Sequence, residues 1–243
     1  MGGPIDYVWS RPRPQPRRQA PSVERIVERA VAIADAEGMA AVSMRRVSAD
    51  LGSGTASLYR YVRNRDELVE LMVDAVQPVD RIEPTGDWRA DLTAVARSRR
   101  AALLRHPWLV AELTGRPVLG PNSLRRLDTA LGAASALTPD ITLAFEVVGT
   151  VLAHVLGAVS AELAEEQAGR RSGLTEAQWR QTVSPYLREV VESGEYPHLT
   201  RAVLGSDDPT AEERFEFGLG CVLDGVASRA AGSSWTAARR LDR

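Results

Sequence analysis

The stretch SMRRVSADLGSGTASLYRYVRNR, residues 43–65, decides the fold of this chain. Ser43 is a natural helix cap, because its hydroxyl can accept a hydrogen bond from a backbone N–H that the first turn leaves unpaired. A short helix to Leu51 is predicted, and Gly52 permits the left-handed backbone conformation that ends such a helix. A second short helix is predicted over residues 55–61. The apolar residues expected to anchor the two helices from behind are Met44, Val47, Leu51, Leu58 and Val62.

Two short helices joined by a glycine turn form a helix-turn-helix motif, whose second helix fits the major groove of DNA. The outward face of that second helix predicts the residues that read base edges, which are Thr55, Ala56, Ser57 and Arg60. Ala56 suits a thymine methyl group and Arg60 suits guanine. Arg45 opens the first helix of the motif beside Arg46, where we expect contact with solvent or phosphate rather than base reading.

The run LYRYVRNRDEL, residues 58–68, resembles the end of the DNA-binding domain of TetR-family transcriptional regulators. In that family a Tyr, a second aromatic or His two residues on, and a basic residue four further on recur. Tyr59, Tyr61 and Arg65 fill those places, and Val62-x-Asn64 looks most like the tetracycline-repressor branch. We expect Tyr59 and Arg65 to contact DNA phosphates, which position the head. Tyr61 could either contact DNA or pack inside the head.

Composition agrees with a DNA-binding globular protein. The 243 residues are 44% apolar, all 30 basic residues are arginine, and the net charge is −2. Residues 1–65 hold eleven Arg against six Asp and Glu, about +5, so the remainder is about −7. Solvated arginines would give the same asymmetry. The single cysteine, Cys221, suits a cytoplasmic location, and the N-terminus lacks the apolar core of a signal peptide.

The chain is expected to be all-α, with four parts. These are a disordered Pro/Arg-rich extension (1–20) that could add phosphate contacts, a helix-turn-helix head (21–78), a helical domain (87–231) and a mobile tail (232–243). Outside the motif, helices are predicted over 22–37, 66–76, 88–105, 108–114, 122–136, 139–166, 175–192, 199–204 and 210–230, with a polar loop at 167–173. Alternating strand patterns and internal repeats are absent from the sequence.

The segment 141–161 is apolar on every side, and it could therefore span a bilayer. A helix buried between its own domain and a partner has the same pattern, and Glu146, Thr150 and His154 favour that reading. RFEFGLGCVLDGV, residues 214–226, resembles the closing helix of the tetracycline-repressor C-terminal domain, and LLRHPWL, residues 103–109, resembles the same branch. The resemblance implies a homodimer through helices 141–164 and 211–230, with no membrane insertion. The stripe expected on the last helix is Phe215, Gly218, Leu219, Val222, Leu223 and Val226.

A few polar groups within an apolar lining are typical of a small-molecule pocket. On that basis, and because the long helix lines the effector cavity in this family, the predicted ligand-binding residues are Trp108, Leu109, Leu113, Phe145, Glu146, Gly149, Thr150 and His154. His154 could equally be a hydrogen-bonded core residue. The metal–drug pattern of tetracycline repressors is not found here, so tetracycline is not the expected ligand. The expected ligand is apolar or aromatic.

Motifs for catalysis or cofactors are missing from the sequence: there is no nucleophile elbow, Walker loop, GxGxxG loop or HExxH pair. We therefore expect no enzyme, no cofactor and no metal site. The predicted function is a homodimeric repressor that a small molecule releases from operator DNA. Two alternatives stay open: a regulator that acts without a ligand, and a helical ligand-binding protein that has lost DNA binding.

Overall fold

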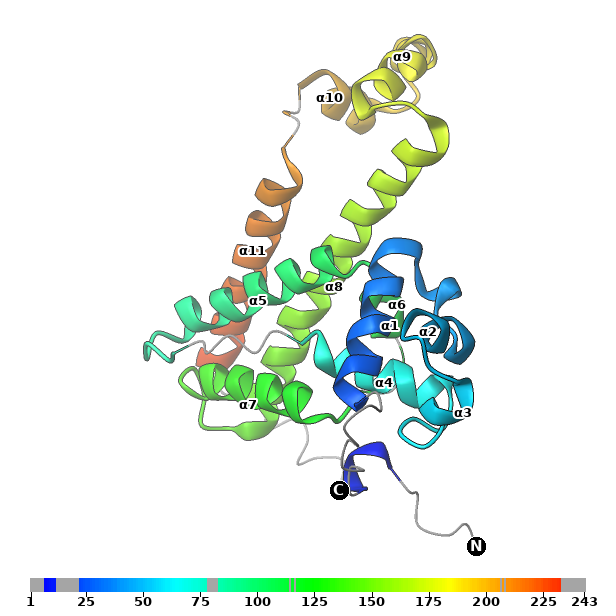
Figure 1. Ribbon diagram of the computed structural model, residues 1–243. Helices are drawn as coiled ribbons and strands as arrows, with labels where there is room; N and C mark the ends of the chain where they lie inside the picture. The colour runs from blue at the N-terminus through cyan, green and yellow to red at the C-terminus, as the bar shows by residue number, and fades with distance from the viewer. Residues whose placement is uncertain are drawn as a thin grey trace, which may run out of the picture.

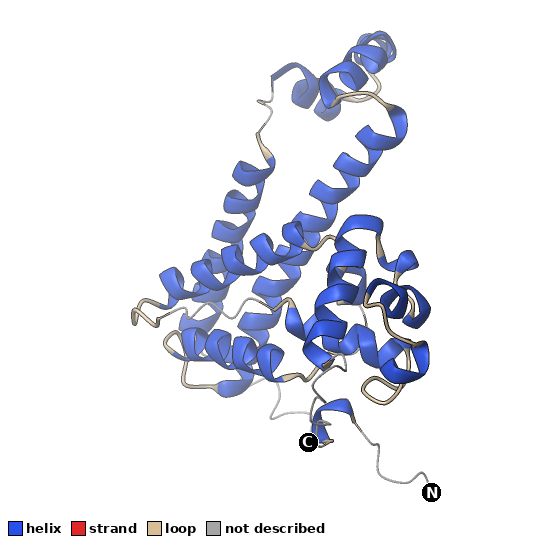
Figure 2. Ribbon diagram, in the orientation of Figure 1, coloured by secondary structure: helices blue, strands red, loops and turns tan. Residues whose placement is uncertain are grey.

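The computed structural model describes residues 7–11, 22–77, 83–113, 115, 117–205, 207 and 209–232, and within these ranges the chain is helical with no strand (Figures 1 and 2). The elements are η1 (Val8–Ser10), α1 (Val23–Glu37), η2 (Met39–Ala41), α2 (Met44–Asp50), α3 (Thr55–Leu58), α4 (Arg65–Ala75), α5 (Trp88–Arg105), α6 (Leu109–Glu112), α7 (Pro121–Ser135), α8 (Ile141–Ser172), α9 (Glu176–Ser193), α10 (Pro197–Gly205) and α11 (Ala211–Ala231). The all-α prediction is confirmed.

Local capping explains where many of these helices begin. The Ser43 hydroxyl accepts from the Arg46 N–H at 3.1 Å, as predicted, and Gly52 has a left-handed φ of 60°. Thr210 forms a capping box with Glu213, in which each side chain accepts from the other residue's backbone N–H. The remaining side-chain caps are Ser22, Asn64, Asp87, Asp140 and Thr175.

Two predicted helix ends are wrong. α3 ends at Leu58 instead of residue 61, because Tyr61 N–H donates to the Leu58 carbonyl in a turn. α8 continues through the predicted loop at 167–173 and ends at Ser172. The left-handed residue that stops it is Gly173 (φ 69°), whereas Gly169 stays helical.

The head, which we define as α1–α4, packs around the helix-turn-helix. α1 lies against α2 and α4, and α2 lies against α3. Four of the five predicted anchors are buried, with Leu58, Val62 and Val47 fully so, and Leu51 is half-buried. This burial fixes which side of α3 faces outward.

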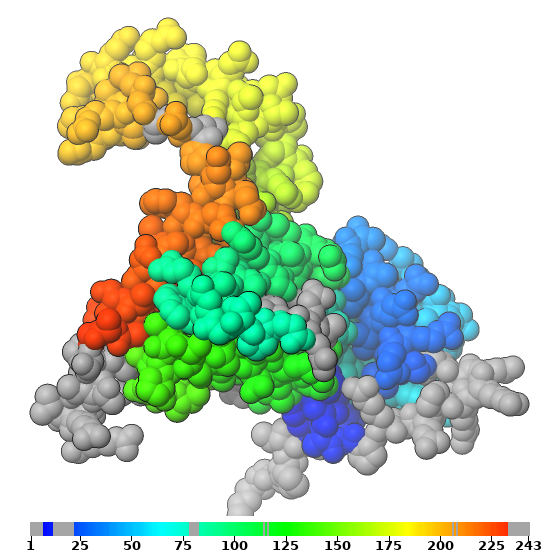
Figure 3. All heavy atoms as spheres, turned by 90° about the vertical axis from the view of Figure 1, so that its left-hand side faces the viewer, coloured from blue at the N-terminus to red at the C-terminus, as the bar shows by residue number. Residues whose placement is uncertain are grey.

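The body, which we define as α5–α11, is arranged around α8. α5, α7 and α11 each pack against α8, while α9 and α10 lie together at the far end of the molecule (Figures 1 and 3). α4 of the head contacts α7 of the body, and one continuous apolar core joins the two. α4 is therefore one of the links between the head and the body.

Residues 7–11 differ from the predicted disordered extension. η1 packs Val8 and Trp9 against the core, the Tyr7 hydroxyl accepts from the Leu119 N–H at 3.1 Å, and Arg11 pairs with Glu67 of α4. Aromatic and apolar residues in this short segment explain why it is ordered. The rest of the extension, most of the linker between head and body, and the tail from 233 lie outside the described residues.

Candidate DNA interface and ligand cavity

The helix-turn-helix is held together by a hydroxyl pair. Ser48 of α2 donates to the Arg45 carbonyl at 2.9 Å, and its Oγ lies 3.0 Å from Oγ1 of Thr55 at the start of α3. Ser48 is buried, so the pair links the two helices inside the motif. The Thr55 hydroxyl therefore has a structural partner, while Ala56 is exposed and Ser57 is half-buried.

The three residues that match the TetR-family pattern differ in exposure and in their contacts. Tyr59 is 50% exposed, whereas Tyr61 is 9% exposed and belongs to the core of the head. Of the two roles left open for Tyr61, the structure thus favours packing. Arg65 is exposed, but its guanidinium donates to the carbonyls of Val42 (3.2 Å) and Met39 (3.0 Å). It ties α4 to η2.

Arg45 and Arg60 are exposed beside Tyr59 on the same motif. Arg46 differs, because it pairs with Glu37 at 2.7 Å and with Asp50 at 3.1 Å. The hydrogen bond that Arg46 donates to Glu37, and then the charges of Asp50 and Glu37, raise the pKa of Arg46. The exposed cations of the motif are suited to a polyanion, which is what a DNA backbone presents.

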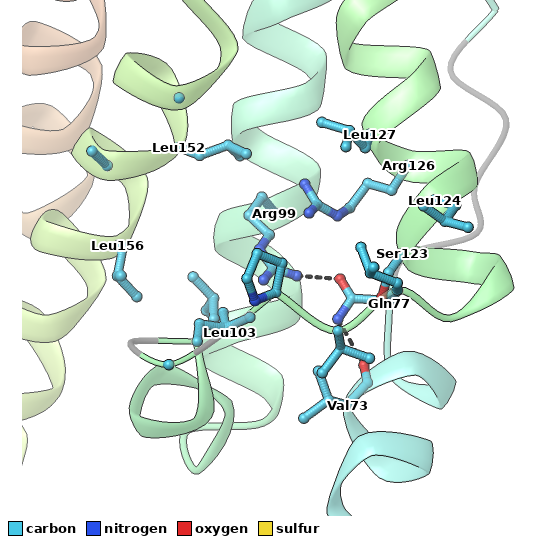
Figure 4. A pocket seen from close by; sticks show the side chains of 17 residues that line it. Val73, Gln77, Arg99, Leu103, Ser123, Leu124, Arg126, Leu127, Leu152 and Leu156 are labelled. Carbon is cyan, nitrogen blue, oxygen red and sulfur yellow. Dashed lines mark hydrogen bonds between the residues drawn. The ribbon is translucent and has the colours of Figure 1, made fainter. Parts of the chain in front are cut away.

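A cavity of about 340 Å³ lies between α5, α7 and α8, next to the end of α4 (Figure 4). Its lining is mainly apolar and includes Leu103, Leu124, Leu127, Leu152 and Leu156. Of the eight predicted ligand-binding residues, only Leu113 and Gly149 line it. The structure places the other six elsewhere.

Phe145, Glu146 and Thr150 lie on the outer face of α8 and are exposed, and the Thr150 hydroxyl donates to the Glu146 carbonyl of its own helix. This corrects their predicted place in the cavity. α8 is apolar on every side, so its sequence does not show which side faces the subunit's own core. The side that packs within the subunit carries Ala144, Val148, Val151 and Val155 instead.

His154 faces α11 rather than the cavity. Its Nε2 lies 3.1 Å from the Phe215 carbonyl, and its ring stacks on the Phe215 ring with centroids 5.5 Å apart. Gly218 allows this approach, because a Cβ there would collide with the His154 ring. The hydrogen bond agrees with the structural alternative for His154, but the side chain is only half-buried and also lines a second cavity, of about 690 Å³, between α8, α9 and α11.

Trp108 and Leu109 lie at the junction with the head. The Trp108 indole N–H donates to Asp35 of α1 at 2.7 Å, and Leu109 is fully buried. His106 Nδ1 lies 2.8 Å from the same carboxylate oxygen. These residues therefore hold the head rather than line the cavity, while Leu113, a few residues on, reaches it.

Three polar residues of the cavity were missed by sequence reasoning: Gln77, Arg99 and Arg126. Gln77, just beyond α4, donates through Nε2 to the Val73 carbonyl (2.7 Å) and accepts from Arg99 Nη1 (2.5 Å) (Figure 4). Arg99 occupies a core position of α5, since Leu92, Val95, Ala96 and Leu103 share its buried face. An arginine within an apolar stripe was the signal that could have found it.

Burial dominates the electrostatics of the two arginines. It lowers the pKa of Arg99 to about 9, with repulsion from Arg126 as the second cause, and it also lowers the pKa of Arg126. A group with a pKa near 9 is still protonated at neutral pH. Nε and Nη1 of Arg126 are buried, and among the described residues they have no hydrogen-bond partner.

A buried carboxylate joins α4 to the cavity helices. Asp74 accepts from the backbone N–H groups of Ser123 (2.8 Å) and Asn122 (3.3 Å), at the start of α7. The preceding Gly120 has no side chain to cap that helix, so Asp74 of the head takes this role. Gly120 sits so close to Asp74 that a Cβ would collide with it.

The described residues contain no group of three potential metal ligands.

One described helix, α8, is long and apolar enough to cross a membrane by length and composition, and 28% of its most apolar stretch is buried within the subunit. The stripe predicted on α11 faces the subunit: Phe215, Leu219, Leu223 and Val226 are buried, and Gly218 and Val222 are half-buried. Phe217, which lies outside that stripe, is 76% exposed.

Comparison with known proteins agrees with both parts of this geometry. The model for bacterial regulatory proteins of the tetR family matches residues 26–72, and the model for the tetracyclin repressor-like C-terminal domain matches residues 82–230. The HTH-type transcriptional repressor DrrR1 of Streptomyces coeruleorubidus is 39% identical over 91% of this chain and 84% of its own. The HTH-type transcriptional repressor Rv1353c of Mycobacterium tuberculosis is 30% identical over 88% of this chain and 84% of its own.

Solved structures show the same architecture. ActR of Streptomyces coelicolor in complex with actinorhodin superposes with a TM-score of 0.70 at 30% identity, covering 89% of this chain and 99% of that one. Apo ActR superposes with a TM-score of 0.69 at 28% identity, covering 87% and 97%. An exposed helix-turn-helix, a helical body with an internal cavity and two matching family models lead to one conclusion: the chain belongs to the TetR family of bacterial transcriptional regulators.

Proposed function

We propose that the chain is a homodimeric, non-enzymatic repressor in the cytoplasm, which releases operator DNA when a small molecule enters the cavity between α5, α7 and α8. The observation that carries this proposal is the position of Gln77. It lines the cavity, and it directly follows α4, the last helix of the head. A molecule that displaces this side chain would act on the head directly. That ActR was crystallised with actinorhodin supports an effector-binding role.

The proposed DNA surface consists of the outward residues of the motif. Ala56, Ser57 and Arg60 are assigned to base edges, and Arg45 and Tyr59 to phosphates. Thr55 is assigned to joining α2 and α3, because its hydroxyl already pairs with Ser48. Exposure of Ala56, Tyr59, Arg60 and Arg45 supports this division. Arg65 is assigned a positioning role, since its guanidinium already holds two backbone carbonyls of the head. The corresponding domains are 21–78 for DNA and 87–231 for effector and dimerisation.

The proposed dimer interface is the outer face of α8 and α11. Ile141, Phe145 and Phe217 are large apolar side chains that are more than half exposed in a single subunit. Large exposed apolar side chains on two helices that pack together are typical of an interaction site. A second copy fits better than a lipid bilayer, because Glu146 and Thr150 interrupt the same face and would be costly to place in lipid.

Three contacts could carry cavity occupancy to the head. Arg99 holds Gln77, Asp74 caps α7, and Trp108 holds Asp35 of α1. A ligand shifts the equilibrium only if it binds better to one conformer. In the conformer that binds the ligand better, the two recognition helices of the dimer would be spaced so that they no longer match successive major grooves of DNA.

The test uses the full-length protein and a DNA duplex obtained by in vitro selection against it. Candidate aromatic compounds are titrated with and without the duplex. Because binding coupling is reciprocal, an effector that weakens DNA binding must itself bind more weakly when DNA is present, by about 1–3 kcal/mol. Selection that yields no preferred sequence would refute the DNA-binding role. Compounds that bind the cavity equally with and without DNA would refute the release mechanism.

A further inference from the structure

Among the described residues that line the cavity, two carry cationic side chains and none carries an anionic one. Arg99 from α5 and Arg126 from α7 both line it, and the described lining residues include no Asp or Glu (Figure 4). Arg99 has a neutral partner, the Gln77 amide oxygen. For Arg126, two buried nitrogens lack any hydrogen-bond partner in the described part of the chain.

This arrangement is unfavourable for the empty protein. A buried charge is normally paired or hydrogen-bonded, because burial removes the water that would otherwise solvate it. The two guanidinium groups also repel each other, as the effect of Arg126 on the pKa of Arg99 shows. Arg100, on the same helix as Arg99, provides a contrast: its side chain is 14% exposed and it pairs with Glu162 at 2.9 Å. Among the described residues, neither Arg99 nor Arg126 has such a carboxylate partner.

We propose that the effector is an apolar, ring-containing organic acid, whose carboxylate binds between Arg99 and Arg126 while its rings occupy the leucine-lined remainder of the cavity. This deepens the proposed function, since it rests on the same cavity and names the chemical class of its ligand. The two planar guanidinium groups supply several N–H donors that match the geometry of a carboxylate. The leucines that make up most of the remaining lining favour contact with apolar rings over a small inorganic anion.

The same geometry explains how an acid would act on the head. A carboxylate that binds Arg99 competes with the Gln77 oxygen for the same guanidinium. Gln77 is then held only by its bond to the Val73 carbonyl of α4. A neutral ligand of the same shape would leave the contact between Gln77 and Arg99 in place.

The test compares two fluorescent probes of matched shape, anthracene-2-carboxylic acid and its neutral carboxamide, in DNA-free titrations of the full-length protein. The wild type is expected to bind the acid about tenfold or more tightly than the amide, as is typical for hydrogen bonds to charged groups. Arg126→Met should remove that preference and leave amide binding within about twofold. Arg125→Met is the matched control, because Arg125 is the exposed neighbour on the same helix.

A second measurement does not depend on the probes. Because two buried nitrogens of Arg126 have no hydrogen-bond partner among the described residues, Arg126→Met is expected to raise the melting temperature of the ligand-free protein relative to Arg125→Met. Equal binding of acid and amide by the wild type would overturn the proposal, and so would a lower melting temperature for Arg126→Met. Neither measurement uses DNA, so a negative result would refute the organic-acid ligand without refuting release of operator DNA by a ligand of another class.

Discussion

Gln77 is where the cavity meets the head, and replacing it offers a quantitative test. Its side chain is 4% exposed and accepts from buried Arg99 at 2.5 Å. Gln77→Met keeps the volume but removes the only hydrogen-bond acceptor that the described structure gives Arg99. A lost hydrogen bond to a charged group costs about 1.5–3 kcal/mol, which for a chain of this size lowers the melting temperature by about 3–12 °C.

Replacing Arg99, the other partner of this hydrogen bond, should lower the stability less than replacing Gln77. Arg99→Met leaves only a neutral amide without its partner, and it removes the repulsion between Arg99 and Arg126. The double variant replaces both polar partners with apolar groups, so it should recover most of the loss seen in Gln77→Met. The double-mutant cycle is therefore expected to give a coupling of about 1.5–3 kcal/mol.

Thermal and urea unfolding at one protein concentration provide the assay, because dimer stability depends on concentration. Gln181→Met, at an exposed position of α9, is the control and should stay within about 0.5 kcal/mol of the wild type. If Gln77→Met unfolds like the control, or if the two single costs simply add, Gln77 and Arg99 are not energetically linked. Operator release by a ligand could then not pass through this contact.

Three further predictions address the DNA surface, the cavity and the dimer. Arg60→Ala should relax base preference at one position of each DNA half-site, at a cost of about 1–3 kcal/mol in binding free energy, whereas Tyr59→Phe should weaken binding to all duplexes alike. If Arg60→Ala lowers affinity equally for all sequences in a selection assay, these roles are reversed. Gly149→Leu should abolish ligand binding in a titration and leave DNA binding intact, because a Cβ at this cavity-lining position meets only open space and the leucine can fill the cavity. Gly149→Ala is the control for the change in helix propensity. Phe217→Asp should give folded monomers by light scattering, because the side chain is 76% exposed in one subunit and the change would bury a carboxylate in the proposed interface. Phe217→Leu is the control and should stay dimeric, and a dimeric Phe217→Asp protein would place the interface elsewhere.

Local sequence determined most of the helices. α5 begins at Trp88 and ends at Arg105 as predicted, because Asp87 caps its first turn and His106-Pro107 ends it. The helix-turn-helix is equally local: Ser43 caps α2, Gly52 turns the chain, and Leu58 anchors α3. Capping, glycine turns and apolar spacing act within a few residues, so the sequence shows them directly.

Tertiary structure alone decided the site. The cavity joins residues from α4, α5, α7 and α8, which are up to about eighty positions apart, and an all-round apolar α8 gave no signal for which side faces inward. For the same reason Phe145 was expected in the cavity and lies outside it. Arg65 was expected at a phosphate from the family resemblance, and its carbonyl partners, Met39 and Val42, are more than twenty residues away, so they gave no local signal. Partners that meet only after the helices pack leave no periodic trace in the sequence, and packing therefore decided which arginines line the cavity and which stay exposed.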